Sequence, residues 1–507
     1  MLKKYTDYME DISCDVLYEK LLSFGMFSEK LPPVFDNKSF TLFCKNNNPK
    51  FNSKKLYDYV RYNTIRNINV PRQIGIPVPM AYEKLCGVLR DNWEEIKTHF
   101  HTQTDSHDYI ISRLHIQLRK NKDTLFDMNY NDWRRGGSPK DDLCIGSRFV
   151  VKTDISTCFP SIYTHSIPWA AIGKSEAKNR LRERSNENSW FNAIDKACQT
   201  VKCRETHGLL IGPHASNLIA EIILGVVDNN LYNKNWRYVR CIDDYTCFVE
   251  TKEKADSFIK DLVIELEKFD LSINHKKTKI EELPSAALEY WVRKLNGFNL
   301  LTPYGQVDYK KASAYLDIAV ELMKASDNNA AVLNYAIKVL SGEKLTNSAR
   351  NYCWKMSMHF CLLYPYLISL MEKYVFEAFK VPKDKINIFI NKAFKDGVSN
   401  RNYEEASYAI YFAIKFDLII EAINCENIVS SNDCIYKLIS FLYYKKLKAN
   451  NELKILREHA LELKKNDSDM YRNWVFVYEV LSASNLNSDW VNLKRNGVSF
   501  LKPEFRF

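Results

Sequence analysis

The hydrophobic periodicity of the chain changes near residue 300, and this change restricts the folds that are open to it. Between residues 149 and 300, strand-like and helix-like patterns alternate, which is typical of an α+β sheet domain. From about residue 310 the strand patterns nearly vanish, and a helical period recurs in Ala312–Lys324, Ala330–Leu340, Tyr403–Phe416, Ile435–Leu447 and Leu453–Lys464. The sequence therefore predicts a mixed segment at 1–148, an α+β domain at 149–300 and an all-α helical array at 301–507.

Composition indicates a globular intracellular protein with a basic surface. The chain has 507 residues, of which 46% are apolar, and its net charge of +10 fits a polyanionic partner without requiring one. The 13 cysteines form no CxxC pair, as expected for reduced thiols. The N-terminus lacks the apolar core of a signal peptide, and the run Phe360–Met371 is shorter than the ~18–20 residues of a membrane span. We expect a cytoplasmic protein without membrane contact.

Three aspartates stand where strand patterns end. Arg148–Asp154 has the pattern of a strand ending on a carboxylate, and Tyr238–Val249 has that of two strands joined at Asp243–Asp244. Adjacent carboxylates repel each other, and a divalent cation such as Mg²⁺, which prefers oxygen ligands, removes that conflict. A two-metal centre for nucleotidyl transfer needs carboxylates from both strands, which places Asp154 beside Asp243.

An Asp-Asp dipeptide in a hairpin turn is also structurally ordinary, because Asp is a favoured turn residue. The segments around the aspartates argue for a function instead. Thr153–Ile162 contains the first aspartate, and Gly208–Ala220 contains Gly212, which permits a close backbone approach ahead of a helix. Leu271–Lys279 supplies lysines that suit the negative charge of a leaving pyrophosphate.

In this order and spacing, the segments resemble the A, B, C and D motifs of reverse transcriptases, over about residues 148–282. The resemblance implies an α+β fingers and palm and two bound ions, Mg²⁺ or Mn²⁺. It implies that the metal ligands are Asp154, Asp243, Asp244 and the backbone carbonyl of Ile155. It implies that Lys277 is the catalytic lysine of motif D, and that the nucleotide contacts are Ile155, Phe159, Gly212, Ser216 and Arg72.

For two of these nucleotide contacts, the resemblance implies a specific role. Phe159 would be the steric gate that clashes with a ribose 2′-hydroxyl. Arg72, in the segment Val70–Gln73, would hold the triphosphate, although a solvated surface charge is an equally good explanation for it.

Two departures from the reverse transcriptase pattern bear on templating. Cys241 stands where the acidic-turn motif usually has Tyr, and Ile211 stands where the glycine motif often has Gln. The usual Tyr and Gln contact primer or template. Ordinary templated copying is therefore not what the sequence predicts.

Further segments match a narrower family: Tyr163–Trp169, Gly173–Ser175, Ala197–Gln199 and Glu205–Gly208. They resemble signatures of the bacterial abortive-infection reverse transcriptases of the AbiK type, and the whole chain is most similar to the member carried by P-two-like prophages. The resemblance implies an anti-phage role, untemplated DNA synthesis from deoxynucleoside triphosphates, and a HEAT-like helical domain that replaces the thumb. It also implies homo-oligomers and a single-stranded DNA product attached to the protein, because a tyrosine hydroxyl of the chain serves as primer.

The sequence offers Tyr5 and Tyr8 as priming tyrosines, because a flexible N-terminal segment would let a hydroxyl reach the metal site. Ordinary packing is the competing explanation for both, since the chain has 30 tyrosines. Two alternative functions stay open: a templated, retron-like RNA-dependent DNA polymerase, and a non-catalytic interaction scaffold that keeps a polymerase fold.

Overall fold

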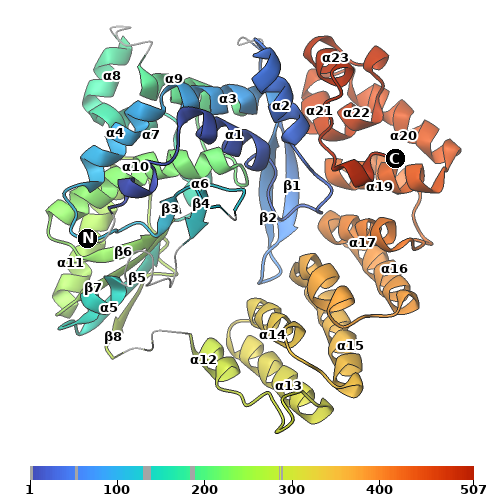
Figure 1. Cartoon of the computed structure of the whole chain (residues 1–507). Helices are drawn as coiled ribbons and strands as arrows, with labels where there is room; N and C mark the ends of the chain where they lie inside the picture. Colours follow the sequence, from blue (N-terminus) through green and yellow to red (C-terminus); the bar gives the residue numbers. More distant parts are fainter. Residues whose placement is uncertain are drawn as a thin grey trace.

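The computed structural model describes residues 4–51, 55–120, 122–128, 139–182, 189–284, 286 and 289–507. A sheet-containing part holds the N-terminal half of the chain, and a curved row of helices holds the C-terminal half (Figure 1). The row runs from α12 (Tyr290–Asn296), below the sheet in this view, to α23 (Ser488–Arg495), beside the N-terminal helices. The part of the chain that the structure describes contains no helix long and apolar enough to cross a membrane.

The N-terminal segment is mixed, as expected, and it carries two small antiparallel sheets, β1–β2 and β3–β4. Its elements are η1 (Thr6–Tyr8), α1 (Cys14–Phe24), α2 (Lys38–Asn47), β1 (Tyr59–Ile65), β2 (Pro71–Pro77), α3 (Pro79–Asp91), α4 (Trp93–Thr104), β3 (Leu114–Ile116), β4 (Phe126–Met128) and α5 (Pro139–Cys144).

The expected α+β domain is present and is built on a four-stranded antiparallel sheet with the strand order β6-β7-β5-β8. Its elements are β5 (Phe149–Asp154), α6 (Cys158–Ser161), α7 (Ser166–Ile172), α8 (Lys174–Arg182), α9 (Trp190–Val201), α10 (His214–Asn233), β6 (Tyr238–Cys241), β7 (Asp244–Val249), α11 (Lys252–Glu267) and β8 (Lys279–Glu282).

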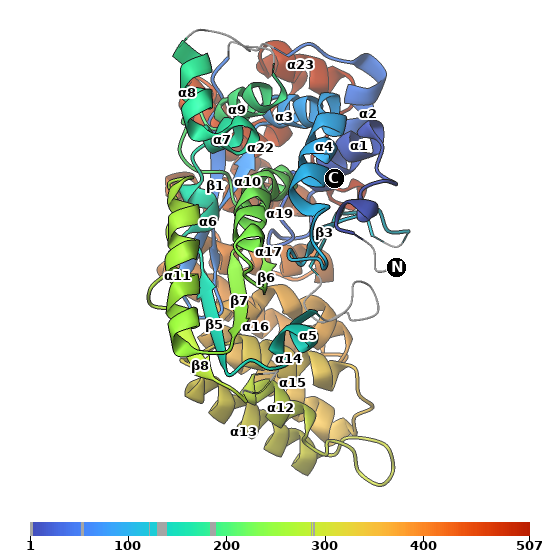
Figure 2. The same cartoon turned by 90° about the vertical axis from the view of Figure 1, so that its left-hand side faces the viewer.

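Helices α10 and α11 cover the same face of this sheet. The side chain of Tyr238 on β6 donates a hydrogen bond to Asp228 of α10 (2.8 Å), and its ring packs on Phe258 of α11 at 5.6 Å. The view in Figure 2 shows both helices running alongside the strands. Buried apolar residues recur at helical spacing along α11, so the pattern that predicts an amphipathic helix here also indicates its buried face.

After β8, the described residues form helices and no further strand apart from isolated bridges, which confirms the expected all-α region. The helices are α12, α13 (Tyr309–Ala325), α14 (Ala331–Ser341), α15 (Asn347–Leu363), η3 (Pro365–Leu370), the π-helical η4 (Glu372–Glu377), α16 (Lys383–Ser399), α17 (Tyr403–Phe416), α18 (Cys425–Ser430), α19 (Cys434–Leu447), α20 (Asn450–Leu463), α21 (Asp467–Arg472), α22 (Trp474–Val480), η5 (Ala483–Asn485), α23 and η6 (Pro503–Phe505). Each predicted helical run corresponds to one helix, with both ends within three residues of the ends of that helix.

Side-chain caps explain several of these helix starts. Asp308, Thr346 and Asp433 precede α13, α15 and α19, and each side-chain oxygen accepts a backbone N–H from the first turn. Such a cap satisfies a donor that the helix itself leaves unpaired, and it is worth about 1 kcal/mol.

The helical array is held to the rest of the chain near its beginning and at its end. At the tip of the β1–β2 hairpin, the Asn67 amide donates to the side chain of Asn329 (2.6 Å), and the Asn67 carbonyl accepts from Ala330 (2.8 Å). At the end of the array, Phe35 bridges to Leu501, and Ser39 Oγ donates to the carbonyl of Ser499 (2.7 Å). The array therefore closes back onto the N-terminal segment.

The structure corrects what two local sequence patterns suggest. A helical period of apolar residues runs without a break over Met80–Phe100, but this stretch forms two helices, because Asn92 leaves the helical conformation (φ −118°, ψ 23°) and its side-chain amide donates to the carbonyl of Val88 at 2.7 Å. The pattern over Leu271–Ile280 is that of a strand, but β8 begins only at Lys279, where it pairs with the first four residues of β5.

We predict that Glu404→Gln makes the protein more stable at pH 8. Glu404 of α17 is buried against β1, where its Oε2 accepts the backbone N–H of Ile65 at 2.5 Å. Burial raises the pKa of this carboxyl from 4.5 to about 8. The folded chain therefore keeps a proton that the unfolded chain releases, so the stabilisation present below pH 4.5 is lost as the pH rises through 8.

The measurement is the free energy of unfolding at pH 5 and pH 8. Glutamine keeps the acceptor without the charge, so the fall in stability between the two pH values shrinks by about 2–4 kcal/mol. Glu458→Gln, at an exposed position on α20, is the control and leaves the pH dependence unchanged. A Glu404→Gln protein with the pH dependence of the parent would contradict the assignment.

Candidate active site

The three aspartates meet at one end of the central sheet. Asp154, the last residue of β5, lies directly opposite Asp244, the first residue of β7, in the antiparallel register. The turn between β6 and β7 is tight, with Ile242 in a left-handed conformation (φ 58°). The backbone N–H of Ile155 donates to the carbonyl of Asp243 at 3.0 Å. The backbone thus joins the two strand ends, as the sequence predicts.

The side chain of Asp154 is buried, and its two oxygens differ in environment. Oδ2 forms an ion pair with the ammonium group of Lys277. Oδ1 is buried without a hydrogen-bond partner among the described residues. The backbone carbonyl of Asp154 accepts from Asn274 at 2.8 Å, which brings the loop that carries Lys277 to the aspartates.

The turn aspartates have an unfavourable electrostatic environment. Burial, and then repulsion by Asp243 and Asp154, raise the pKa of Asp244 from 3.8 to about 6. Burial likewise raises the pKa of Asp243, with a contribution from Asp154 that Lys277 and Arg72 partly offset. Each pKa shift reflects the free-energy cost of ionising one carboxylate next to another in a site that is partly shielded from water.

These residues fit a divalent cation. A hard cation supplies what this site lacks, namely a partner for the buried Oδ1 of Asp154 and positive charge between opposed carboxylates. In the conformation described, no group of three or more His, Cys, Asp and Glu side chains is arranged to hold a metal ion within the described ranges. The metal role of Asp154, Ile155, Asp243 and Asp244 therefore stays a prediction.

A cleft of about 1140 Å³ opens in front of the aspartates. It brings together seven residues of the predicted site: Arg72, Asp154, Ile155, Phe159, Asp243, Asp244 and Lys277. Its rim is basic, because Arg66, Lys202 and Arg204 line it as well. A cleft with carboxylates at its base and five cationic side chains along its walls suits a phosphorylated substrate bound with a metal ion.

Comparison with known families agrees with this geometry. Residues 107–311 match the family model described as reverse transcriptase (RNA-dependent DNA polymerase), and this segment contains all three aspartates and Lys277. Residues 107–311 are therefore a reverse transcriptase domain. The match covers less than half of the chain, and no curated protein sequence matches significantly.

Solved structures similar to the chain include two telomerases. The telomerase from Candida albicans, in complex with a fragment of telomeric RNA, is 11% identical, with 86% of this chain and 69% of that chain covered and a TM-score of 0.31. The apo telomerase from Candida tropicalis is also 11% identical, with 87% and 71% covered and a TM-score of 0.29.

Phe159 enters the cleft from α6 and is half-buried. Its carbonyl accepts the backbone N–H of Leu209 at 2.8 Å, and the N–H of Gly208 donates to Ile162. Gly208 has φ +85°, and a Cβ there would lie 2.8 Å from the carbonyl oxygen of Pro160. The close contact between these two segments of the reverse transcriptase domain therefore depends on this glycine.

Gly212 and Ser216 are not among the residues that line the cleft. Gly212 has φ +121°, and a Cβ there would lie 2.7 Å from Cγ2 of Ile74 on β2, so its visible role is close packing against the β1–β2 hairpin. Ser216 is buried in the first turn of α10. A nucleotide contact stays a prediction for both.

The N-terminal segment is not free, contrary to the expectation for Tyr5 and Tyr8. Both side chains are buried, the Tyr8 ring stacks on His115 (4.8 Å), and the Tyr5 hydroxyl lies 3.0 Å from the carbonyl oxygen of Leu114. Tyr59 of β1 is the one tyrosine among the described residues that line the cleft. Priming from Tyr5 or Tyr8 would require that the N-terminal segment leave its site.

Several cleft residues were not indicated by the sequence pattern. Lys202 and Arg204 lie in the turn that follows α9, and the only sequence signal for them was two cations shortly before Gly208. Arg66 lies at the tip of the β1–β2 hairpin, where a charged residue is ordinary. Arg240 lies outside the cleft, behind the acidic turn, and only its charge within a buried strand could have indicated a role.

We predict that Gly212→Ala costs about 2 kcal/mol or more of stability, through its positive φ and the contact with Ile74. Gly146→Ala is the matched control, because Gly146 also has a positive φ (+81°) but no heavy atom within 4 Å of the added Cβ. Chemical denaturation of both variants measures the difference. Equal losses would show that Gly212 is not needed for the approach to β2.

Proposed function

We propose that the protein is a DNA polymerase of the reverse transcriptase type that joins deoxynucleotides at Asp154, Asp243 and Asp244. The observation that carries this proposal is the opposition of Asp154 and Asp244 across neighbouring strands, at the base of a basic cleft. Like charges at this position are costly without a cation, whereas nucleotidyl transfer requires carboxylates that hold metal ions beside phosphates.

The residues of the cleft have separate roles in this reaction. Bound Mg²⁺ or Mn²⁺ would lower the pKa of the attacking hydroxyl and balance the charge of the phosphates. Asp154, Asp243 and Asp244, with the carbonyl of Ile155, hold the ions. The attacking hydroxyl gives its proton to water, and its oxygen forms a bond to the α-phosphorus as the bond between that phosphorus and the pyrophosphate oxygen breaks. Lys277 turns from Asp154 to the leaving pyrophosphate and gives it a proton.

The walls of the cleft select the substrate. Arg72 on β2 reaches the triphosphate, and Phe159 excludes a ribose 2′-hydroxyl, so that deoxynucleotides are used. Arg66, Lys202 and Arg204 lie on the same cleft and contact phosphates of the nucleotide or of the growing strand. On this proposal Gly212 and Ser216 also contact the nucleotide.

We further propose that the polymerase acts in phage defence by abortive infection, without a template and from a tyrosine primer. The support is the resemblance of the signature segments to the AbiK-type enzymes, together with Cys241 and Ile211 at positions that usually contact primer or template. On this proposal the single-stranded DNA product stays attached to the protein, the array at 301–507 is HEAT-like and replaces the thumb, and the chain forms homo-oligomers in the cytoplasm.

We predict that Asp243→Asn combined with Asp244→Asn abolishes incorporation of labelled deoxynucleotides, with a loss of at least about 10³-fold. The reason is that the amides cannot hold a divalent cation between the strands. Incorporation in the presence of Mg²⁺ or Mn²⁺, followed on denaturing gels, is the measurement.

Asp270→Asn is the matched control for this experiment. Asp270 pairs with Lys174 on the surface and has a positive φ that Asn tolerates. Its activity should equal that of the parent. Full incorporation by the double variant would remove the metal-site proposal, whereas a parent protein without incorporation would favour the non-catalytic scaffold.

We predict that protein incubated with deoxynucleotides and Mg²⁺ gains a covalent nucleotide adduct on a tyrosine. Mass spectrometry of tryptic peptides measures it, and it distinguishes Tyr5 and Tyr8 from Tyr59, the tyrosine in the cleft. Product from a single deoxynucleotide on protein stripped of nucleic acid would support untemplated growth.

The templated, retron-like alternative makes the opposite prediction. It requires an added RNA and a nucleic-acid primer, and it leaves every tyrosine unmodified. Absence of any adduct, combined with RNA-dependent synthesis, would contradict protein priming while leaving the polymerase assignment intact.

A further inference from the structure

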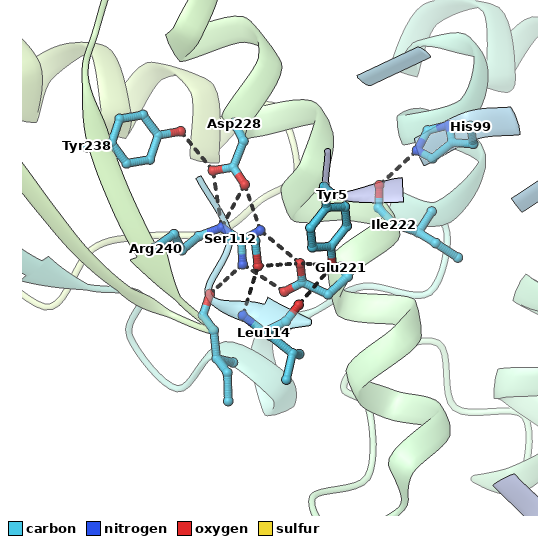
Figure 3. Close-up of polar contacts among 10 residues, drawn as sticks. Tyr5, His99, Ser112, Leu114, Glu221, Ile222, Asp228, Tyr238 and Arg240 are labelled. Carbon is cyan, nitrogen blue, oxygen red and sulfur yellow. Dashed lines mark hydrogen bonds and ion pairs between the residues drawn. The ribbon is translucent and has the colours of Figure 1, made fainter. Parts of the chain in front are cut away.

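A buried ionic network lies directly behind the acidic turn, which comprises residues 241–244. Its centre is Arg240 on β6, whose side chain is fully buried between two carboxylates of α10. Glu221 and Asp228 are seven residues apart, so they lie on the same face of that helix. Figure 3 shows the guanidinium group between them.

The guanidinium group uses its donors on both carboxylates. Nη1 and Nη2 donate to the oxygens of Glu221 at 2.8 and 3.1 Å, and Nη2 and Nε donate to Oδ2 of Asp228 at 2.6 and 2.9 Å. Paired, charge-assisted hydrogen bonds of this kind fix the plane of the guanidinium group as well as its position.

One bond of Arg240 reaches the acidic turn itself. Nη1 donates to the backbone carbonyl of Ile242 at 2.8 Å. Ile242 has φ 58°, a conformation that is strained for a β-branched residue, and it immediately precedes Asp243 and Asp244. The hydrogen bond therefore holds the peptide that sets the direction of the two aspartates.

Hydroxyl groups complete the network, because one cation faces two carboxylates. Ser112 donates to Glu221 at 2.9 Å, and Tyr238 donates to Asp228 at 2.8 Å. The Tyr5 hydroxyl lies 3.2 Å from Glu221 and 3.0 Å from the carbonyl oxygen of Leu114, and its proton serves one or the other. Figure 3 shows its ring directed at Glu221. Tyr5 thereby connects the N-terminal segment to the support of the turn.

A purely structural role would not need this arrangement. Replacing a complete buried ion pair by apolar residues is often neutral or stabilising, so such a network is weak evidence for stability alone. This network differs in one respect. Arg240, a buried cation, also donates a hydrogen bond to the carbonyl of Ile242, the strained residue next to the predicted metal ligands.

We propose that Arg240 is a positioning residue for Asp243 and Asp244, and that the Tyr5 hydroxyl sets its orientation through Glu221. The proposal rests on the proposed function, since it assigns a support to the same metal site. On this account the docked N-terminal segment is part of the active polymerase, and its departure loosens the acidic turn.

The test uses the full chain with Tyr5→Phe and Arg240→Lys. Tyr5→Phe removes one hydroxyl and keeps the ring, whereas Arg240→Lys keeps the charge but cannot span Glu221, Asp228 and Ile242 together. Tyr18→Phe is the matched control, because Tyr18 is also buried and donates to a half-buried carboxylate, Glu83 at 2.9 Å, outside the network.

Two quantities are measured with each protein. Mn²⁺ binding is followed by electron paramagnetic resonance without nucleotide, and the Mg²⁺ concentration for half-maximal extension is measured on a single-stranded DNA oligonucleotide supplied as primer. We expect Tyr5→Phe to weaken Mn²⁺ binding and raise the Mg²⁺ requirement about 3–10-fold. Arg240→Lys should change both more than 10-fold, and Tyr18→Phe should change neither.

Melting temperatures distinguish a positioning role from a loss of folding. If Arg240→Lys does not fold, Tyr5→Phe alone tests the proposal, provided that it melts at the same temperature as the parent. If Tyr5→Phe changed neither Mn²⁺ binding nor the Mg²⁺ requirement, the proposal would be overturned. This holds even if the variant could no longer attach a nucleotide to its own tyrosine. A parent protein that neither binds Mn²⁺ nor extends the oligonucleotide would instead overturn the proposed function, and the positioning role with it.

Discussion

The opposition of Asp154 and Asp244 is the constraint on which the rest of the site depends. Antiparallel pairing places the two residues side by side on neighbouring strands, and burial raises the pKa of Asp244 to about 6. A site of this kind is stable only if positive charge lies close by. The chain supplies some of it through Lys277, which is paired to Asp154. A divalent cation between the carboxylates would supply the remainder.

The surrounding elements determine the position of the cleft walls in front of Asp154 and Asp244. The β1–β2 hairpin, which carries Arg72, is held at its tip by Asn329 and along its length by α17, so the helical array helps to set where that arginine lies. The end of the array pairs with the segment around Phe35. The C-terminal half of the chain is therefore connected, through the β1–β2 hairpin and the N-terminal segment, to the wall of the cleft that carries Arg72 (Figure 1).

Sequence patterns predicted what depends on local periodicity and missed what depends on distant contacts. The helix at Tyr403–Phe416 agrees with its apolar period to the residue, and the strand that ends at Asp154 and the strand pair around Asp243–Asp244 agree with their strand patterns. The break at Asn92 was missed because the helical period continues through it, while the backbone of Asn92 leaves the helical conformation. Tyr5 was expected to be free, and no local signal could show that Glu221, 216 residues away, lies beside its hydroxyl.

The most direct test of the metal centre is anomalous diffraction from crystals grown with Mn²⁺ and a non-hydrolysable deoxynucleotide. The account predicts Mn²⁺ density at the carboxylates of Asp154, Asp243 and Asp244, with the triphosphate in the cleft toward Arg72 and Lys277. A nucleotide bound in the cleft with no ion at these aspartates, or Mn²⁺ bound only at other positions, would contradict it.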